Sequence, residues 1–354
     1  MKIESRKNNN FDLLRLILAL MVFLAHASIL SQAQELGFIG EYISATVAVQ
    51  GFFVISGFLI FCSYENSNSI SHYAIKRVAR IYPAYFIVII LAILIGSMIT
   101  SADQYFGYES FKYFFANIVF LNFLHPTLPG VFEGNYINAI NGSLWTLKIE
   151  VMFCASVPII IWLAKYIKRS FLFVGIFILS CLYNIAMQHL AEKTGSGFYK
   201  ILSHQLPAQM TYFIAGAACY YWFELFAKYK NILLGLSIIL YCAAEYVGML
   251  SVWLRPLVIA IWVIYFAYFI VHIGNFSKYG DFSYGVYITH FPIIQMLVSY
   301  GLFEESAIKA LFVSAALVFI SSFVLWHLVE SKALNLAHGY VKKKRNVDML
   351  VRLS

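Results

Sequence analysis

Apolar stretches of about twenty residues recur along the whole chain, and no other feature constrains its fold as strongly. As helices, such stretches span the hydrocarbon core of a bilayer, where the backbone must satisfy its own hydrogen bonds. They are continuous rather than alternating in hydrophobicity, which favours helices over a barrel. Only 12% of the 354 residues are charged, whereas soluble domains carry roughly 25%. We therefore predict an all-α fold, a polytopic membrane helical bundle.

Eleven apolar segments can be drawn along the sequence. They are residues 11–31, 42–62, 81–100, 111–124, 145–164, 171–190, 208–226, 231–250, 256–273, 283–300 and 308–328. Charge decides how many of them cross, because Lys and Arg concentrate in cytoplasmic loops. All basic clusters lie inside only if segment 111–124, the shortest, is re-entrant or interfacial. We predict about ten transmembrane helices with both termini cytoplasmic.

The same topology predicts the domain organisation. We expect one transmembrane domain over residues 1–335 and a basic cytoplasmic tail over residues 336–354. The net charge of +8 reflects cytoplasmic Lys and Arg beside membrane lipid and gives no argument for a nucleic-acid partner. External residues 101–144 combine turn formers with aromatic side chains, which predicts a folded lid over an external opening.

The cysteine spacing argues against metal or disulfide frameworks, and the first apolar segment argues against cleavage as a signal peptide. The five cysteines lie in apolar segments without a CxxC pair, so we predict no metal site and no disulfide framework. Ala25-His26-Ala27 has the form of a signal-peptide cleavage site. Because Arg15 interrupts the preceding apolar stretch, we expect this segment to be retained as a span.

Ionisable side chains in the first apolar segment are the strongest functional signal, because such groups are costly inside a membrane. Arg15 and His26 lie eleven residues apart, so they share one helix face with an axial separation of about 16 Å. Asp12 precedes Arg15 by three residues and can pair with it. Two alternatives stay open: Arg15 snorkels to the interface, and His26 satisfies a buried carbonyl.

The second span carries one motif, and another follows it on the cytoplasmic side. Gly51 and Gly57 allow close backbone approach, and Ser56 can bond across helices. Arg77 and Arg80 are three residues apart at a helix start. They can anchor the cytoplasmic end of the helix or hold a phosphate in bidentate fashion.

Two more motifs lie in the second half of the chain. Trp145, Lys148 and Glu150 enter the membrane from outside, and residues two apart point to different helix faces, so Glu150 has a partner other than Lys148. In segment 282–292, the proline at position 292 kinks the helix and frees carbonyls beside His290.

Taken in order, these motifs resemble the acyltransferase-3 family of membrane acyltransferases, which includes bacterial O-antigen and exopolysaccharide O-acetyltransferases. The matching stretches are FDLLRLILALMVFLAH at 11–26 with its R-x10-H pattern, GFFVISGFLI at 51–60, KRVARIYPAYF at 76–86, LWTLKIE at 144–150, FSYGVYITHFP at 282–292 and HLVE at 327–330. Thr146 and Lys148 depart from the LWSLSVE element of the family. The resemblance is to single-domain members without an extracytoplasmic hydrolase-like domain.

The resemblance implies an O-acyltransferase with acyl-CoA, typically acetyl-CoA, as donor substrate, no permanently bound cofactor, and a cell-surface or lipid-linked glycan as acceptor. It also implies the inner membrane of a bacterium. In this interpretation the His26 imidazole, which titrates near neutrality, is a general base or a transient acyl carrier. The implied catalytic residues are His26, Arg15 and Asp12, the implied donor-binding residues are Arg77, Arg80, Ser56 and Gly57, and the implied acceptor-binding residues are Trp145, Glu150 and His290.

Three other classes of function were weighed. A transporter or flippase would line a path with the intramembrane charges, but it does not explain the ordered motifs. A lipid-linked glycosyltransferase favours acidic residues in the first outer loop, where Glu35 and Glu41 lie without an obvious motif. A non-catalytic partner that kept the fold is disfavoured by the intact Arg15 and His26.

Overall fold

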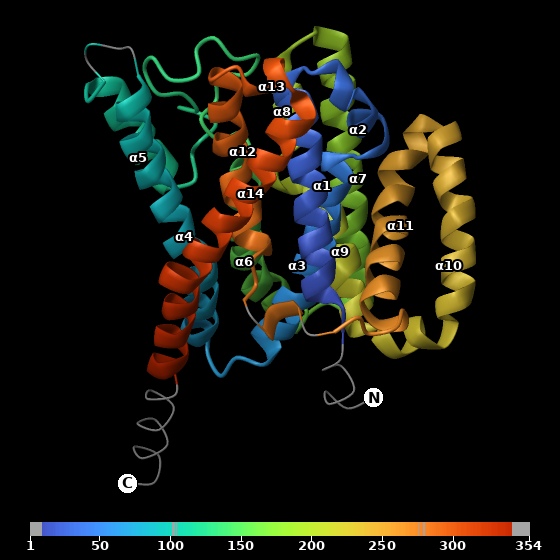
Figure 1. Ribbon diagram of the computed structural model, residues 1–354. Coiled ribbons are helices and arrows are strands. Elements are labelled where there is room, and N and C mark those ends of the chain that lie inside the picture. The colour runs from blue at the N-terminus through green and yellow to red at the C-terminus, as the bar shows by residue number, and fades with distance from the viewer. Residues whose placement is uncertain (1–8, 101–102, 104, 275, 279, 342–354) are drawn as a thin grey trace, which may run out of the picture. The chain divides into compact units, whose positions relative to one another are not determined.

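The computed structural model describes residues 9–100, 103, 105–274, 276–278 and 280–341, and every regular element in this part of the chain is a helix (Figure 1). The all-α prediction is confirmed. The elements are α1 (Phe11–Ser31), η2 (Gln34–Leu36), α2 (Gly37–Tyr42), α3 (Ala45–Glu65), α4 (Ile70–Ile99), α5 (Tyr108–Ile118), α6 (Trp145–Leu163), α7 (Arg169–Thr194), α8 (Gly197–Leu202), α9 (Leu206–Tyr221), α10 (Phe223–Tyr246), α11 (Gly248–Phe269), η3 (Phe276–Lys278), α12 (Ser283–Ser299), α13 (Leu302–Glu305), α14 (Ala307–Leu325) and η4 (Trp326–Glu330).

Eight helices among the described residues are long and apolar enough to cross a membrane, which confirms a polytopic membrane protein. They are α1, α3, α4, α6, α7, α10, most of α11, and the continuous helix Ala307–Val341 that includes α14 and η4. The two other predicted spans form α9, with 16 residues, and α12, with 17. Helix α5 has 11 residues, about 16 Å, and is too short to cross, as predicted for segment 111–124. The orientation of the termini stays a prediction.

Two helix boundaries differ from the sequence prediction. Helix α4 begins at Ile70 because the Ser69 side chain accepts a hydrogen bond from the backbone N–H of His72 at 3.1 Å, an N-cap. Arg77 and Arg80 therefore lie well inside the helix rather than at its start. The last helix continues through Val341, past the predicted domain boundary at residue 335, and residues 342–354 of the predicted tail lie outside the described residues.

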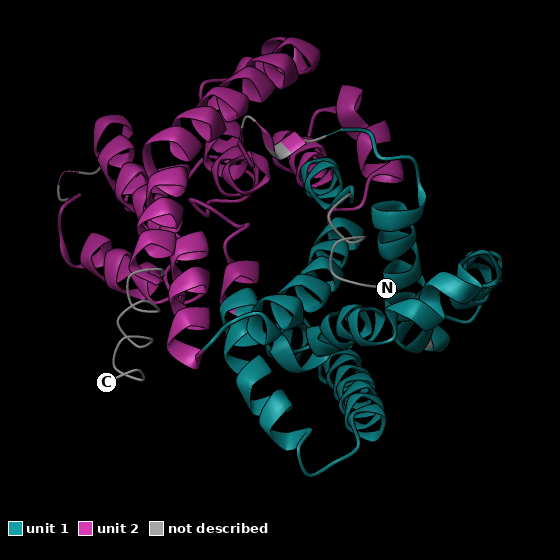
Figure 2. Cartoon of the chain, turned by 90° about the horizontal axis from the view of Figure 1, so that it is seen from below, with its two compact units in different colours: residues 1–18, 46–68, 149–275 teal, residues 19–45, 69–148, 276–354 magenta. Residues whose placement is uncertain are grey.

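The chain divides into two compact units, coloured separately in Figure 2. The first unit comprises residues 1–18, 46–68 and 149–275, and in it α10 packs along α11 while α9 packs against both α7 and α11. The second unit comprises residues 19–45, 69–148 and 276–354. There α12 packs along α14, and α4 contacts α5, α12 and η4. The C-terminal part of α1, including His26, belongs to this second unit.

Within the first unit, two glycines let α3 and α9 approach until their backbones touch. A Cβ atom on Gly57 would overlap the carbonyl oxygen of Phe213, and one on Gly216 would overlap the carbonyl oxygen of Val54. Small residues at helix interfaces permit such contact in membranes, where van der Waals packing drives helix association. The geometry gives Gly57 a packing role, and its predicted part in donor binding stays a prediction.

We expect Gly57→Ala to destabilise the protein by about 1–3 kcal/mol, because the added methyl group forces the two helices apart. The matched control is Gly175→Ala in α7 of the same unit, where a Cβ atom would meet nothing within 4 Å. That control should be neutral or stabilising, since alanine is the better helix former by about 1 kcal/mol. Thermal unfolding in detergent measures both, and equal midpoints for the two variants would contradict the packing role.

Candidate functional site

The structure brings two histidines of the second unit together. His26 Nδ1 lies 2.8 Å from His290 Nε2, within hydrogen-bond distance. His290 is fully buried, whereas His26 is half-buried. The ring of Phe291 stands edge-on to His26, with centroids 5.3 Å apart. Residues from α1 and α12, far apart in the sequence, thus form an imidazole pair with one accessible member.

One backbone carbonyl of α12 has no helical donor because of a proline, and a side chain from outside the helix bonds to it beside this pair. Pro292 has no N–H to give to the carbonyl of Ile288, four residues earlier. The side-chain amide of Asn141 donates to that carbonyl instead, at 2.8 Å. Next to it, a Cβ atom on Gly142 would lie 2.7 Å from the ring of Phe291, so a larger residue there would force this ring to shift. The sequence predicted freed carbonyls beside His290, and the structure supplies the donor.

A neighbouring hydroxyl pair connects the start of α6 to α12. Thr146 Oγ1 lies 2.7 Å from the hydroxyl of Tyr287, and both residues are buried. The hydroxyl of Tyr287 also donates to the carbonyl of Ser143 at 3.3 Å. Thr146, which departs from the family motif, therefore holds the helix that carries His290.

Arg80, predicted to bind the donor, is engaged by two carboxylates in the second unit. Its guanidinium forms an ion pair with Asp281 and lies 3.9 Å from a carboxylate oxygen of Glu330. Glu330 is 2% exposed, and neither of its oxygens accepts a hydrogen bond from the described residues. It ends η4, a π-helical turn, and such turns often occur at functional sites. A donor phosphate would have to compete with Asp281 for this guanidinium.

The other predicted site residues lie on several elements. In the first unit, Asp12 and Arg15 form the predicted ion pair at the start of α1. The remaining ones are half-buried, apart from the buried Gly57: Ser56 and Gly57 on α3, Arg77 on α4, and Trp145 and Glu150 on α6. The structure therefore confirms the Asp12–Arg15 pair, brings His26 and His290 into a contact that was not predicted, and leaves the other assignments as predictions.

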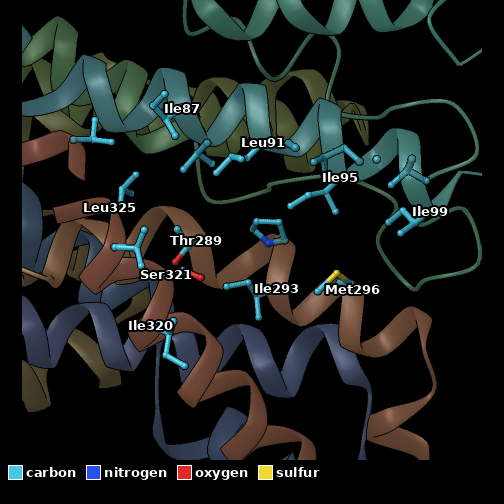
Figure 3. A pocket seen from close by; sticks show the side chains of 18 of the residues that line it. Ile87, Leu91, Ile95, Ile99, Thr289, Ile293, Met296, Ile320, Ser321 and Leu325 are labelled. Carbon is cyan, nitrogen blue, oxygen red and sulfur yellow. The ribbon is translucent and has the colours of Figure 1, made fainter. Parts of the chain in front are cut away.

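An apolar cavity of about 460 Å³ lies between α4, α12, α14 and residues 131–140 (Figure 3). Thr289 and Ser321 supply the only side-chain hydroxyls among its lining residues, and the Thr289 hydroxyl already donates to the carbonyl of Gly285 at 2.8 Å. Thr289 and Ile293 face the cavity, whereas His290 is turned by about 100° on the helix. The cavity suits a hydrocarbon chain better than a sugar, and it is separate from the imidazole pair.

The family model for an acyltransferase domain, that of the acyltransferase-3 family, matches residues 8–327. The chain belongs to the acyltransferase-3 family. The matched range includes every site residue predicted above, and the eight candidate spans agree with a multi-pass membrane acyltransferase.

Two relatives of this acyltransferase-3 protein agree with that assignment. The chain is 26% identical to an O-acetyl transferase of Shigella phage Sf6 over 337 residues, which are 93% of the chain and 96% of that protein. It is 32% identical to nodulation protein 10 of Rhizobium leguminosarum bv. viciae over 178 residues, which are 47% of the chain and 48% of that relative. No solved structure matches.

Sequence reasoning missed several residues that shape the site of this acyltransferase. One of them is Asp281. Its carboxylate accepts from the backbone N–H of Ser283 at 3.3 Å and from the Ser283 hydroxyl at 2.5 Å, and this turn has a signal in the sequence. An Asp two residues before a helical Ser is typical of such a turn. Asn141 is one of the turn formers in residues 101–144. Its bond to α12 could not be predicted from local sequence.

We expect Asp281→Ala to destabilise the acyltransferase by about 3–5 kcal/mol, because it leaves the largely buried guanidinium of Arg80 without its closest carboxylate. The control is Glu245→Ala, which removes an ion pair to Arg255 whose side chains are 46% and 38% exposed. That change should cost about 0–1 kcal/mol. Unfolding midpoints in detergent compare the two, and a loss no greater than that of the control would contradict the structural role of Asp281.

Proposed function

We propose that this acyltransferase moves an acyl group, typically acetyl, from cytoplasmic acyl-CoA to a hydroxyl of a cell-surface or lipid-linked glycan. The observation that carries the proposal is the accessible imidazole of His26, held against the buried His290. The printed name of the phage relative, O-acetyl transferase, supports acetyl as the group transferred. We place the protein in the cytoplasmic membrane of a bacterium, with the acyl-CoA as a substrate and not a resident cofactor.

The direct route uses His26 as a general base. Its imidazole takes the proton of the sugar hydroxyl while that oxygen attacks the thioester carbonyl of the donor. The carbon–sulfur bond breaks, an ester bond forms, and the proton passes from the imidazolium to the leaving CoA thiolate. A side chain that takes a proton from the reacting group in the transition state contributes typically 10²–10⁴-fold to such a step.

The second route passes through an acylated histidine. The His26 imidazole attacks the thioester carbonyl, the carbon–sulfur bond breaks, CoA leaves as its thiolate, and an acylimidazolium that keeps its ring proton remains. The sugar hydroxyl then attacks this intermediate, its proton passes to the CoA thiolate, and the sugar leaves as the ester while the neutral imidazole is regenerated. Both routes need an imidazole nitrogen with an accessible lone pair, and both consume one acyl-CoA for each ester formed.

The donor is held by basic residues in this proposal. Arg15, oriented by its ion pair with Asp12, lies on α1 eleven residues before His26, about 16 Å along the helix axis. Arg77 lies near the cytoplasmic end of α4 in the predicted topology, where guanidinium groups suit the phosphates of CoA. A long donor could then leave its anionic head near the cytoplasm and extend its thioester into the membrane. Trp145 and Glu150 remain proposed acceptor contacts.

We expect Arg77→Ala to raise the KM for acetyl-CoA at least tenfold, because a hydrogen bond to a charged group contributes about 1.5–3 kcal/mol. The KM for acetyl-pantetheine, which lacks the phosphates, should change little. Initial rates in inside-out membrane vesicles test this, with Arg255→Ala as the control. A similar rise for both donors would remove Arg77 from phosphate binding.

The proposed function is tested by transfer of label from acetyl-labelled acetyl-CoA to total glycan in inside-out vesicles. We expect label with the wild type and at least about 10²-fold less with His26→Ala at matched expression. His189→Ala, which changes an exposed histidine of α7, should label like the wild type.

Equal label with His26→Ala and the wild type would remove His26 from the mechanism. No label with any variant, across acetyl and longer acyl donors, would contradict the acyltransferase reaction proposed here and favour transport of a glycan or a small anion.

A further inference from the structure

We propose that His290 is a positioning residue: it fixes the tautomer of His26 so that Nε2 of His26 carries the lone pair that reacts. The inference rests on the proposed function for the role of His26. The family resemblance implies that His290 binds the glycan acceptor. The inference gives His290 a different role. Its basis is the geometry of three consecutive groups, namely the Val286 carbonyl, the His290 ring and the His26 ring.

The two imidazoles meet edge to edge in nearly one plane. Their planes differ by 9° and their centroids lie 5.1 Å apart, while the two facing nitrogens are 2.8 Å apart. The centroid distance exceeds the nitrogen distance by about two ring radii, which requires a nearly linear, in-plane arrangement rather than face-to-face stacking. Ring N–H bonds and nitrogen lone pairs both lie in the ring plane, so one nitrogen donates directly to the other.

A backbone carbonyl decides which nitrogen donates. His290 Nδ1 lies 3.0 Å from the carbonyl oxygen of Val286. A carbonyl oxygen only accepts, so Nδ1 of His290 carries a hydrogen. In a neutral ring the other nitrogen, Nε2, is then an acceptor. His26 must therefore donate through its own Nδ1–H, which leaves the lone pair of His26 on Nε2.

Accessibility agrees with this direction. His290 is fully buried and uses both ring nitrogens, one toward Val286 and one toward His26. His26 as a residue is half-buried, its Nδ1 is engaged by His290, and its Nε2 has no hydrogen-bond partner among the described residues. Nε2 is therefore the ring nitrogen of His26 left for a substrate.

The relay also supports the charge that develops during reaction. When His26 Nε2 takes a proton or an acyl group, its ring becomes cationic and its Nδ1–H donates more strongly to His290 Nε2. Charge-assisted hydrogen bonds are roughly twice as strong as neutral ones. No proton needs to leave Nδ1 of either ring, so His290 acts by orientation and polarisation alone. A neutral acceptor that orients a catalytic histidine has the same task as the carboxylate of hydrolase triads.

The first test reads the tautomer directly, by nitrogen NMR of the detergent-solubilised full chain with ¹⁵N-labelled histidine. The chain has 9 histidines, and the His26 signals are identified by their loss in His26→Ala. We expect Nδ1 of His26 to be protonated and Nε2 not. A protonated Nε2 with a bare Nδ1 in the wild type overturns the proposal.

The second test separates orientation from folding with two variants. His290→Leu removes the acceptor, and we expect the maximal rate of acetyl transfer to fall about 10²-fold, the scale of a misplaced reacting group. The KM for acetyl-CoA should stay within about twofold of the wild type. His290→Gln keeps an acceptor oxygen near the position of Nε2 and should recover most of the rate and the Nδ1–H tautomer of His26.

Failure of this inference differs from failure of the proposed function. If His26→Ala is inactive while His290→Leu transfers acetyl at the wild-type rate, His290 has no positioning role and the acyltransferase proposal stands. If His290→Leu and His290→Gln lose activity equally although both remain folded, the acceptor argument is wrong. If His26→Ala is as active as the wild type, the role proposed for His26 fails, whatever its tautomer.

Discussion

The imidazole pair depends on one constraint: in a membrane, a backbone carbonyl without a partner is costly, so α12 cannot be kinked without compensation. Pro292 breaks the helical hydrogen-bond ladder two residues after His290, and Asn141 closes the gap from outside the helix. The Asn141 amide and the Ser143 hydroxyl both bond to backbone carbonyls of α12, so residues 141–143 hold this part of the helix in place. Because α12 is held in place, the His290 ring keeps a fixed position, and its hydrogen bond to His26 keeps one geometry.

Buried charges in the second unit, like buried carbonyls, are paired with groups that stabilise them. Arg80 pairs with Asp281 and lies beside Glu330, which joins α4 to the segment before α12 and to the end of η4. The pair tolerates burial because each charge has an opposite charge at hand. Arg80 therefore has a role in helix packing, whereas the part of Arg77 in donor binding stays a proposal. The family resemblance treated both as equivalent.

In the two proposals, α1 and α12 have different roles in the reaction of the acyltransferase. Helix α1 carries the reactive imidazole and, eleven residues earlier, the Arg15–Asp12 pair. Helix α12 carries no reacting group in this scheme, but through Val286 and His290 it sets the proton on the His26 ring. The apolar cavity on another face of α12 lies apart from this chemistry. A helix of ordinary hydrophobic composition therefore has a positioning function that composition alone would not reveal.

The sequence by itself determined the fold class, because hydrophobic length and continuity admit only helices in lipid. It also determined the Arg15–Asp12 pair and the freed carbonyl near His290, since both follow from spacing within one helix. Only the tertiary structure decided the contacts of His26 with His290, 264 residues apart, and of Arg80 with Asp281, 201 apart. Such contacts depend on which helix faces meet. Helices uniformly apolar around their circumference carry little periodicity to specify those faces, so packing of individual side chains settles them.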